Sequence, residues 1–224
     1  MKTLEIIYKD ALLLAINKPS GLPVHKGAGR KMITLEDYMD GLRFGLPTRP
    51  ELAHRLDKDT TGCLLLGRNK TALKRLGELF QKHAIHKTYI ALVHGKMENP
   101  SGEISLKIAK KSRDKKSWWG KVDENGQEAL TKYEVLDSND LASIVKLIPL
   151  TGRTHQLRIH MQALGHPIMG DKIYGAKDDK MPLSLHCYSM EVPLYAKRDK
   201  IVVTAAFPEE FKAAMQEFNL QQPL

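Results

Sequence analysis

The chain alternates short apolar runs with polar turns, and many of the apolar runs follow one another directly. Residues 4–8 and 11–17 indicate two neighbouring strands separated by Lys9 and Asp10. Residues 62–67, GCLLLG, form a short apolar run bounded by glycines, which is typical of a buried strand. Further strands are predicted at residues 87–95, 128–136, 141–150, 184–192 and 201–207.

Helical spacing appears between these groups of strands. Residues 34–44 carry apolar positions at helical intervals, and Thr34 precedes Asp37 by three residues, as in a capping box. Asn69 is a suitable N-cap for a second helix. The apolar side chains expected to face inward in these two helices are Leu35, Tyr38, Met39, Leu42, Leu73, Leu76, Leu79 and Phe80.

Two more helices are predicted in the second half of the chain. Residues 154–165 fit a helix with Thr154 as N-cap and Gly165 just past its end. Pro208 is placed to begin a final helix. Their expected inward positions are Leu157, Met161, Leu164, Phe211, Met215 and Phe218.

Because strands come in adjacent groups with helices between the groups, the order of elements predicts an α+β fold with a mainly antiparallel sheet. We find no internal repeat and no linker that forces a boundary, so residues 1–224 are expected to form one domain. A chain of this length buries roughly 70% of its unfolded surface, enough for a core without disulfides or metal.

Charge and cysteine content narrow the class of function. Lys and Arg number 35 against 26 acidic residues, a net charge of +9. This excess favours a polyanionic partner, with nucleic acid the simplest choice and an anionic membrane surface the weaker one. Cys63 and Cys187 form no C-x-x-C pair, and no signal peptide is recognisable at the amino terminus. We expect a cytoplasmic, soluble, monomeric protein.

The stretch HRLDKDTTG, residues 54–62, concentrates polar side chains immediately before the apolar run Leu64–Leu66. Asp57 lies in a loop that leads into a buried strand, a position where scaffolded loops commonly carry function. Arg55 flanks it. The structural alternative is an aspartate that only caps a turn and pairs with a surface arginine.

A second polar concentration is TGRTHQLRIH, residues 151–160. With Thr154 as N-cap, Arg153 lies at the positive end of the helix dipole, which is unfavourable for a cation by up to about 1 kcal/mol. A nearby carboxylate or phosphate would offset that cost. The alternative is an exposed basic helix start.

Residues 107–121 hold seven Lys or Arg, one Asp and both tryptophans of the chain. Clustered cations neutralise phosphates, and a tryptophan can stack on an unpaired base. The alternative is a solvated basic hairpin whose tryptophans pack into the domain. The candidate RNA contacts in this stretch are Lys110, Lys111, Lys115, Lys116 and Trp118.

Several kinds of site lack their motifs. The histidines form no H-E-x-x-H, and no cysteine pair is present, so a zinc site is not expected. Residues 27–31 lack the phosphate-loop spacing, and there is no G-x-S-x-G.

Four stretches in order resemble the RluA family of RNA pseudouridine synthases. They are NKPSGLPVH (17–25), HRLDKDTTG (54–62), KTYIALVHG (87–95) and TGRTHQLRIHMQALGHPIMGD (151–171). Weaker similarity at 126–136 and 185–190 extends the resemblance over nearly the whole chain. Few residues precede the first strand, so the chain is similar to the short members without an amino-terminal RNA-binding domain.

The resemblance implies the pseudouridine synthase catalytic fold with a central RNA-binding cleft, acting on structured ribosomal or transfer RNA. It makes Asp57 the catalytic carboxylate and Arg55 the residue that enters the RNA where the target base leaves. It makes Tyr89 the residue that packs on the flipped uracil, and it pairs Arg153 with Asp57. No metal or redox cofactor is implied, because the isomerisation only moves the uracil from N1 to C5 on the same ribose.

The reaction fits these residues but leaves the role of the carboxylate open. Asp57 could stabilise a cationic sugar, attack it, or remove a sugar proton. A guanidinium close to a carboxylate opposes the effect of burial, which gives Arg153 a purpose. Flipping the base costs a few kcal/mol, and an arginine can fill the gap. The alternatives are a non-catalytic RNA-binding or ribosome-assembly protein on the same fold and, more distantly, a metal-dependent nuclease.

Overall fold

The structure is a computed structural model of the chain, and it describes residues 4–26, 32–110, 119–176 and 179–222. The chain divides into two compact units. The first unit comprises Met1–Lys87 and Cys187–Phe207, and the second comprises Thr88–His186 and Pro208–Leu224.

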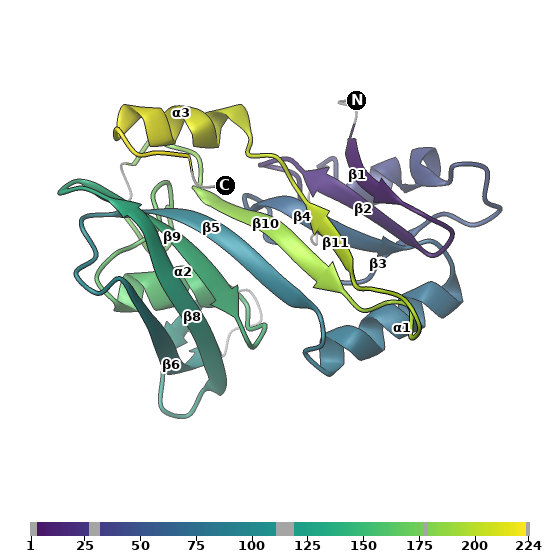
Figure 1. The fold of residues 1–224 in the computed structure, drawn as a ribbon, viewed down its shortest axis with the longest axis horizontal. Coiled ribbons are helices and arrows are strands. Elements are labelled where there is room, and N and C mark those ends of the chain that lie inside the picture. Colours follow the sequence, from purple (N-terminus) through teal and green to yellow (C-terminus); the bar gives the residue numbers. More distant parts are fainter. Residues whose placement is uncertain (1–3, 27–31, 111–118, 177–178, 223–224) are drawn as a thin grey trace. The chain divides into compact units, whose positions relative to one another are not determined.

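The first unit is built on a sheet in which four pairs of neighbouring strands run antiparallel (Figure 1). β3 is added to β4 and β11 to β10. The pairs β1–β2, β2–β4, β3–β4 and β10–β11 are antiparallel. In spatial order the main path of the sheet is β1 (Glu5–Lys9), β2 (Leu13–Lys18), β4 (Thr61–Gly67) and β10 (Leu185–Val192), and the added strands are β3 (Glu51–Leu52) and β11 (Ile201–Thr204).

β4 confirms the buried strand predicted from its leucines. Every residue from Thr61 to Gly67 is buried, because β4 has β2 on one side and β10 on the other. Gly62 lies at φ +103°, and a Cβ there would stand 2.2 Å from the carbonyl oxygen of Cys187. Only glycine permits that backbone and that approach, so the final glycine of HRLDKDTTG is required by packing.

Two helical segments complete the first unit. α1 (Lys70–Gln81) begins as predicted, since the Asn69 side chain accepts the Ala72 N–H at 2.9 Å. The predicted helix at 34–44 is a 3-10 helix, η1 (Leu35–Leu42), in which the Asp37 carboxylate accepts the Thr34 N–H at 2.9 Å. The apolar spacing could not distinguish the two helix types, because either one buries positions three to four residues apart.

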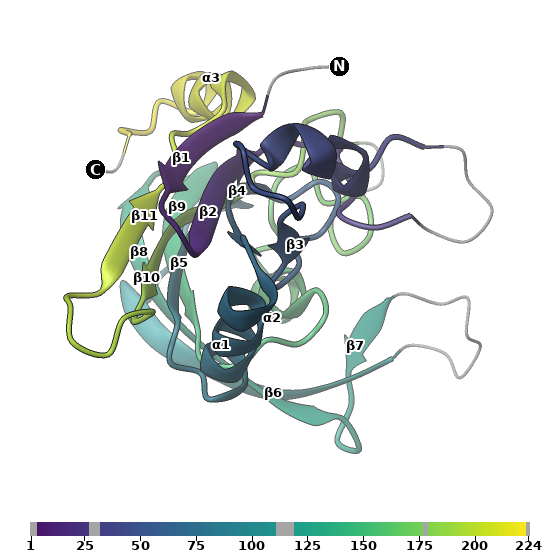
Figure 2. The same ribbon diagram turned by 90° about the vertical axis from the view of Figure 1, so that its right-hand side faces the viewer.

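The second unit contains a sheet whose strands are also antiparallel to their neighbours. β6 and β7 form the hairpin seen at the edge of Figure 2. The core between this sheet and α2 includes Val93, Ile104, Val145 and Met161. In spatial order the strands are β5 (His86–His94), β9 (Ala142–Pro149), β8 (Gln127–Ser138), β6 (Ser101–Lys110) and β7 (Gly120–Val122).

α2 (Gln156–Ala163) is shorter than predicted and begins differently. The prediction of Thr154 as N-cap is wrong: the N-cap is His155, whose φ is +56°, because Thr154 lies inside a turn closed by the Gln156 N–H, which donates to the Arg153 carbonyl at 3.1 Å. Leu164, predicted to face inward, is 39% exposed. Gly165 follows the helix at φ +85°, as expected.

α3 (Glu209–Glu217) follows Pro208, which serves as its N-cap, and confirms the last predicted helix. Phe211 and Met215 are buried, and Phe218 is half-buried. The fold combines helices with antiparallel strand pairs, which confirms the α+β class. No helix in the described part of the chain has the length and apolarity needed to cross a bilayer.

Candidate active site

The polar loop between β3 and β4 carries Arg55 and Asp57. Leu56 between them is 4% exposed and anchors the loop in the first unit. Arg55 is exposed, and Asp57 is half-buried. The loop turns back on itself, since the Thr60 N–H donates to the Asp57 carbonyl at 3.2 Å. A buried leucine flanked by two polar side chains therefore presents Arg55 outward and leaves Asp57 partly shielded from water.

His54 opens this loop. Its Nε2 accepts the backbone N–H of Leu65 in β4 at 2.9 Å. Its ring packs against Phe80 of α1 with 4.6 Å between ring centroids. Burial and, next, the nearby Lys87 ammonium lower the pKa of His54 to about 3, so the imidazole is neutral at physiological pH.

Lys18 lies beneath the same loop, and its functional position was not anticipated from the sequence. The side chain is fully buried at the end of β2. Its Nζ donates to the carbonyls of Pro19 at 2.8 Å, Leu22 at 3.1 Å and Lys58 at 2.8 Å. An ammonium has three N–H donors, so these carbonyls satisfy it completely.

Lys18 acts on the loop through its charge as well as through its hydrogen bonds. Burial lowers the pKa of Lys18 to about 7, while the charges of Asp59 and Asp57 oppose that shift. In its protonated form Lys18 therefore attracts the carboxylate of Asp57. The signal available in the sequence was the stretch NKPSGLPVH, but spacing alone could not show that Lys18 reaches residue 58.

Tyr89 and Arg153, the two other predicted site residues, belong to the second unit. Tyr89 is half-buried in β5 and packs against the core cluster of that unit. The Nε of Arg153 donates to the carbonyl of Glu128 at 2.9 Å. Because the N-cap is His155 and not Thr154, Arg153 lies one residue farther from the start of α2 than expected. The pairing of Arg153 with Asp57 stays a prediction.

Gln156, the first residue of α2, organises the segment that carries Arg153. The side chain is 4% exposed. Its Oε1 accepts the Arg153 N–H at 3.0 Å and the Thr151 hydroxyl at 2.7 Å. Its Nε2 donates to the Leu130 carbonyl and to the Thr131 hydroxyl, both at 3.0 Å. A single buried amide thus ties the Arg153 segment to β8.

A buried ion pair supports the same helix. The Arg158 guanidinium donates to both Asp171 carboxylate oxygens, at 2.7 Å and 2.6 Å. Asp171 is 1% exposed and also accepts the N–H groups of Ile173 and Tyr174. Desolvation raises the pKa of Asp171, but the hydrogen bonds and the charge of Arg158 outweigh it and leave that pKa below its ordinary value.

Tyr174 connects this ion pair to the β6–β7 hairpin. Its hydroxyl accepts the Gly120 N–H at 3.0 Å and lies 2.9 Å from the Nδ1 of His155. The Arg158 guanidinium lies 5.2 Å from the centroid of the Tyr174 ring. The start of β7 and the start of α2 are therefore joined through one side chain.

The basic stretch is only partly within the described residues. Lys110 is exposed at the end of β6, and Trp119 is 46% exposed just before β7. The two strands that flank the stretch, β6 and β7, pair antiparallel, as in a hairpin. The other predicted contacts in it, Lys111, Lys115, Lys116 and Trp118, lie outside the described residues.

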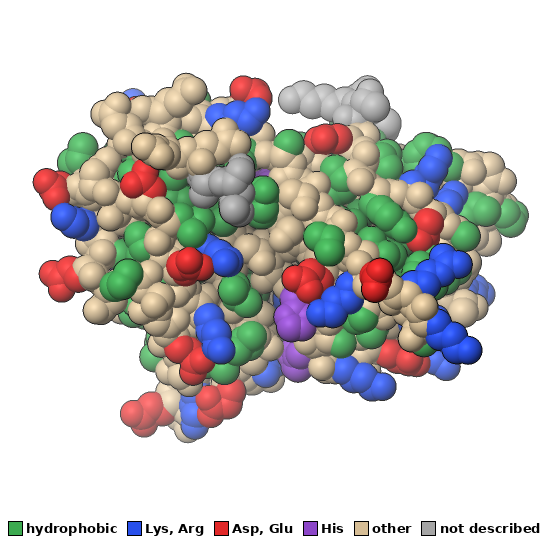
Figure 3. All heavy atoms as spheres, in the orientation of Figure 1, with side chains coloured by type: hydrophobic (Ala, Val, Ile, Leu, Met, Phe, Trp, Pro, Cys, Tyr) green, Lys and Arg blue, Asp and Glu red, His purple; other side chains and the backbone are tan. Residues whose placement is uncertain are grey.

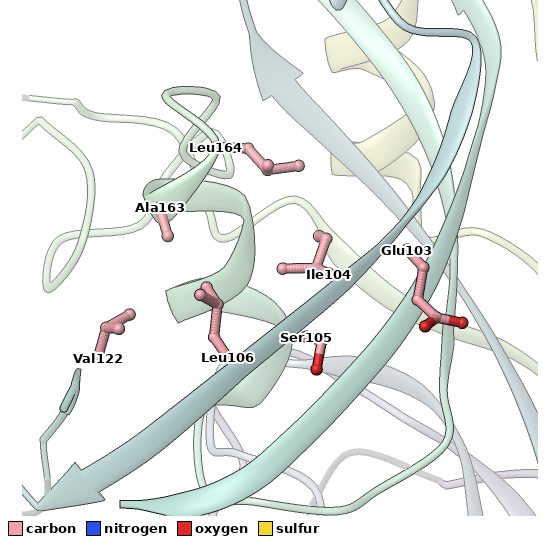
Figure 4. Close-up of a pocket in the computed structure, with 7 residues that line it drawn as sticks. All are labelled: Glu103, Ile104, Ser105, Leu106, Val122, Ala163 and Leu164. Atoms are coloured by element: carbon pink, nitrogen blue, oxygen red, sulfur yellow. The ribbon is translucent and has the colours of Figure 1, made fainter. Parts of the chain in front are cut away.

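The second unit also has an apolar hollow of about 450 Å³ between β6, β7 and α2 (Figure 4). Ile104, Leu106, Val122 and Leu164 surround it, and Glu103 lies at its rim. None of the predicted site residues lines this hollow. Its walls bring no set of polar groups together, so it is not the site of the chemistry.

Within the described ranges no group of three His, Cys, Asp or Glu side chains is arranged to hold a metal ion. Cys63 and Cys187 are buried and are not joined in a disulfide. Burial raises the pKa of Cys63 to about 12, which makes this thiol unreactive.

Comparisons with known proteins agree with this picture. A family model described as RNA pseudouridylate synthase matches residues 12–163. An uncharacterized RNA pseudouridine synthase of Zymomonas mobilis is 40% identical over 91% of this chain and 92% of its own. The ribosomal large subunit pseudouridine synthase D of Borreliella burgdorferi is 34% identical, over 95% of this chain and 68% of its own.

A solved structure extends the agreement to the fold. Human RNA pseudouridylate synthase domain containing 4 superposes with a TM-score of 0.84 at 27% identity, over 98% of this chain and 95% of that one. The family model spans both the loop of Asp57 and the segment of Arg153. The chain therefore belongs to the RNA pseudouridylate synthase family and is an isomerase that converts uridine to pseudouridine in RNA.

Proposed function

We propose that the chain isomerises uridines in large-subunit ribosomal RNA, with Asp57 as the catalytic carboxylate. The observation that carries the assignment of Asp57 is the loop itself: a half-buried aspartate follows an anchoring leucine and lies above the buried ammonium of Lys18. The RNA class follows from relatives named ribosomal large subunit pseudouridine synthase, of the C and D types.

The reaction balances with no added reagent. The N1–C1′ bond of the uridine breaks, the uracil turns, and a C5–C1′ bond forms. The hydrogen on C5 leaves, and N1 gains a proton. Asp57 supplies negative charge at the ribose while the bond is broken, and the Lys18 ammonium favours that charge in a partly buried loop. Partial burial also limits water, which would otherwise trap C1′.

The target base has to leave its stack, at a cost of a few kcal/mol. Arg55 is exposed two residues before Asp57, which suits a side chain that enters the RNA where the base leaves. Tyr89 offers a flat face and a hydroxyl to the flipped uracil. Arg153 pairs with Asp57 and is held by the amide of Gln156.

Basic side chains supply the rest of the RNA contact. Lys110, at the end of β6, is one proposed RNA contact. The others come from the stretch that follows it in the sequence: Lys111, Lys115, Lys116 and Trp118. On the face drawn in Figure 3, Lys and Arg side chains gather over α1 and the connection between β10 and β11. The exposed lysines and arginines of α1, of the residue that follows it and of the β10–β11 connection are Lys70, Lys74, Lys82, Lys197, Arg198 and Lys200. The protein acts as a monomer in the cytoplasm, without metal or redox cofactor.

The test is tritium release from RNA labelled at uracil C5, because formation of the C5–C1′ bond expels that hydrogen. Large-subunit, small-subunit and transfer RNA transcripts are supplied separately to the wild-type chain and to Asp57→Ala. We expect release from the large-subunit transcript alone, lost in the variant. Release from transfer RNA alone would contradict the proposed substrate, and release by Asp57→Ala would contradict the proposed residue.

A further inference from the structure

The catalytic loop leaves its strand at an unusual hydrogen bond. In the β3–β4 pair, Glu51 is opposite Gly67 and Leu52 is opposite Leu66. At the next position the Ala53 N–H donates to the Leu65 carbonyl at 3.2 Å. In a regular antiparallel ladder the Leu65 N–H would donate back to the Ala53 carbonyl. Here it donates to the His54 Nε2 at 2.9 Å. The imidazole thus replaces a backbone acceptor where the chain departs from the ladder.

This bond fixes the chemical form of the ring. A nitrogen that accepts an N–H carries no proton, so the hydrogen of the neutral imidazole is on Nδ1. His54 also has a hydrogen bond with the backbone of Arg55, which the Nδ1–H can donate. Burial and the charge of Lys87 lower the pKa of His54, so its Nε2 stays unprotonated and able to accept over the whole physiological pH range. His54 therefore joins β4 to the first peptide of the loop.

The remainder of the loop is held independently. The Leu56 side chain is buried. The Lys58 carbonyl accepts from the Lys18 ammonium at 2.8 Å. The ring of His54 is itself fixed against Phe80 of α1. Both sides of Asp57 are thus attached to rigid elements, His54 on the amino-terminal side and Lys18 on the other.

We propose that His54 is a positioning residue for the isomerisation: its imidazole sets the point at which the loop leaves the β3–β4 ladder and thereby the place of Asp57. The inference rests on the proposed role of Asp57. It assigns His54 no contact with the RNA and no proton transfer. Loss of the imidazole should lower the rate of the chemical step and leave RNA affinity nearly unchanged, because Arg55 and the basic surfaces remain.

The experiment compares four variants with the wild-type chain. His54→Ala removes the acceptor. His54→Gln restores one, because the glutamine carbonyl oxygen can occupy the place of Nε2. His86→Ala removes an exposed histidine of β5. Leu76→Ala destabilises α1 through a fully buried side chain, by about 2–5 kcal/mol.

For each variant, kcat and KM are measured by tritium release well below its unfolding temperature. Hydrogen exchange of the Leu65 amide is followed by NMR. We expect His54→Ala to lower kcat by about 10- to 100-fold, the loss typical of a small misplacement of a reacting group, with KM nearly unchanged and Leu65 exchange accelerated. His54→Gln should restore both, and His86→Ala and Leu76→Ala should keep kcat.

Three results would overturn the inference. They are unchanged Leu65 exchange in His54→Ala, unchanged kcat despite faster exchange, and an equal loss of kcat in Leu76→Ala. A fifth variant, Asp57→Asn, separates this failure from failure of the proposed function. If Asp57→Asn is inactive while His54→Ala is normal, only the positioning role of His54 is contradicted. If Asp57→Asn is active, the assignment of Asp57 as the catalytic residue is contradicted.

Discussion

Replacing Gln156 by leucine should damage catalysis from within the core of the second unit. The amide makes four hydrogen bonds, to Arg153, Thr151, Leu130 and Thr131. Leucine is of similar size and makes none of them. The change therefore removes polar contacts with little change in side-chain volume.

The expected loss of stability depends on which hydrogen bonds the partners of Gln156 keep after the substitution. The Leu130 carbonyl still accepts the Leu150 N–H at 2.9 Å, and the two threonine hydroxyls can rotate. Arg153 is half-buried, and its N–H loses the acceptor in Gln156; leaving such a group unsatisfied costs about 1–3 kcal/mol. With about 1 kcal/mol for each of the other contacts that is incompletely replaced, we expect the free energy of unfolding to fall by about 2–4 kcal/mol.

Gln156→Glu separates the two ends of the amide. A carboxylate keeps the acceptor for the Arg153 N–H but loses both donors to β8. If the acceptor end positions Arg153, Gln156→Glu should retain more kcat than Gln156→Leu, although a buried carboxylate also destabilises the chain. Gln162→Leu is the matched control, since it makes the same change at an exposed position of the same helix.

Urea unfolding gives the stability, and tritium release gives kcat and KM. We expect kcat to fall by about 10- to 100-fold in Gln156→Leu, less in Gln156→Glu, and not at all in Gln162→Leu. A Gln156→Leu variant that loses about 2–4 kcal/mol of stability yet turns over at the wild-type rate would contradict this prediction, because the amide would then be structural only.

Three further predictions concern stability and RNA affinity. Asp171→Asn should lower the free energy of unfolding by about 3–5 kcal/mol, because it leaves the Arg158 guanidinium buried without its counter-charge; a loss below 1 kcal/mol in urea unfolding would contradict this. Burial lowers the pKa of His160 to about 4, so the unfolded state binds more protons between pH 4 and 6.5, and stability should fall as pH drops through that window by up to about 1.4 kcal/mol per pH unit. His160→Asn should flatten this dependence in urea titrations at several pH values, and an unchanged slope would argue against it. Neutralising the basic stretch should weaken RNA binding and reduce its salt dependence, measured by filter binding from low to high salt, whereas an unchanged slope would place the RNA elsewhere; the residues are Lys110, Lys111, Lys115 and Lys116.

Local patterns predicted the elements that depend on local chemistry. The run of leucines identified β4, and Asn69 identified the start of α1. The N-cap of α2 was predicted one residue too early, because Thr154 has the right chemistry for an N-cap. In the structure Thr154 lies in a turn before the helix, and the Gln156 amide ties that turn to partners about 25 residues earlier in β8.

The candidate site shows the same division. Asp57 and Arg55 could be selected from one polar stretch and from family resemblance. Lys18 could not, because its contact with the Lys58 carbonyl spans 40 positions of the chain. His54 gave no separate signal either, since its role depends on a strand ladder that is interrupted at Ala53. Contacts of this kind exist only once the sheet has formed.

The most direct test of the account is a single-turnover measurement of tritium release by Asp57→Asn at saturating enzyme, with C5-labelled large-subunit RNA. Asparagine preserves the size of the side chain and removes its charge. We expect the variant to bind the RNA with wild-type affinity and to release no label. Release at the wild-type rate would show that the carboxylate of Asp57 does not carry the isomerisation.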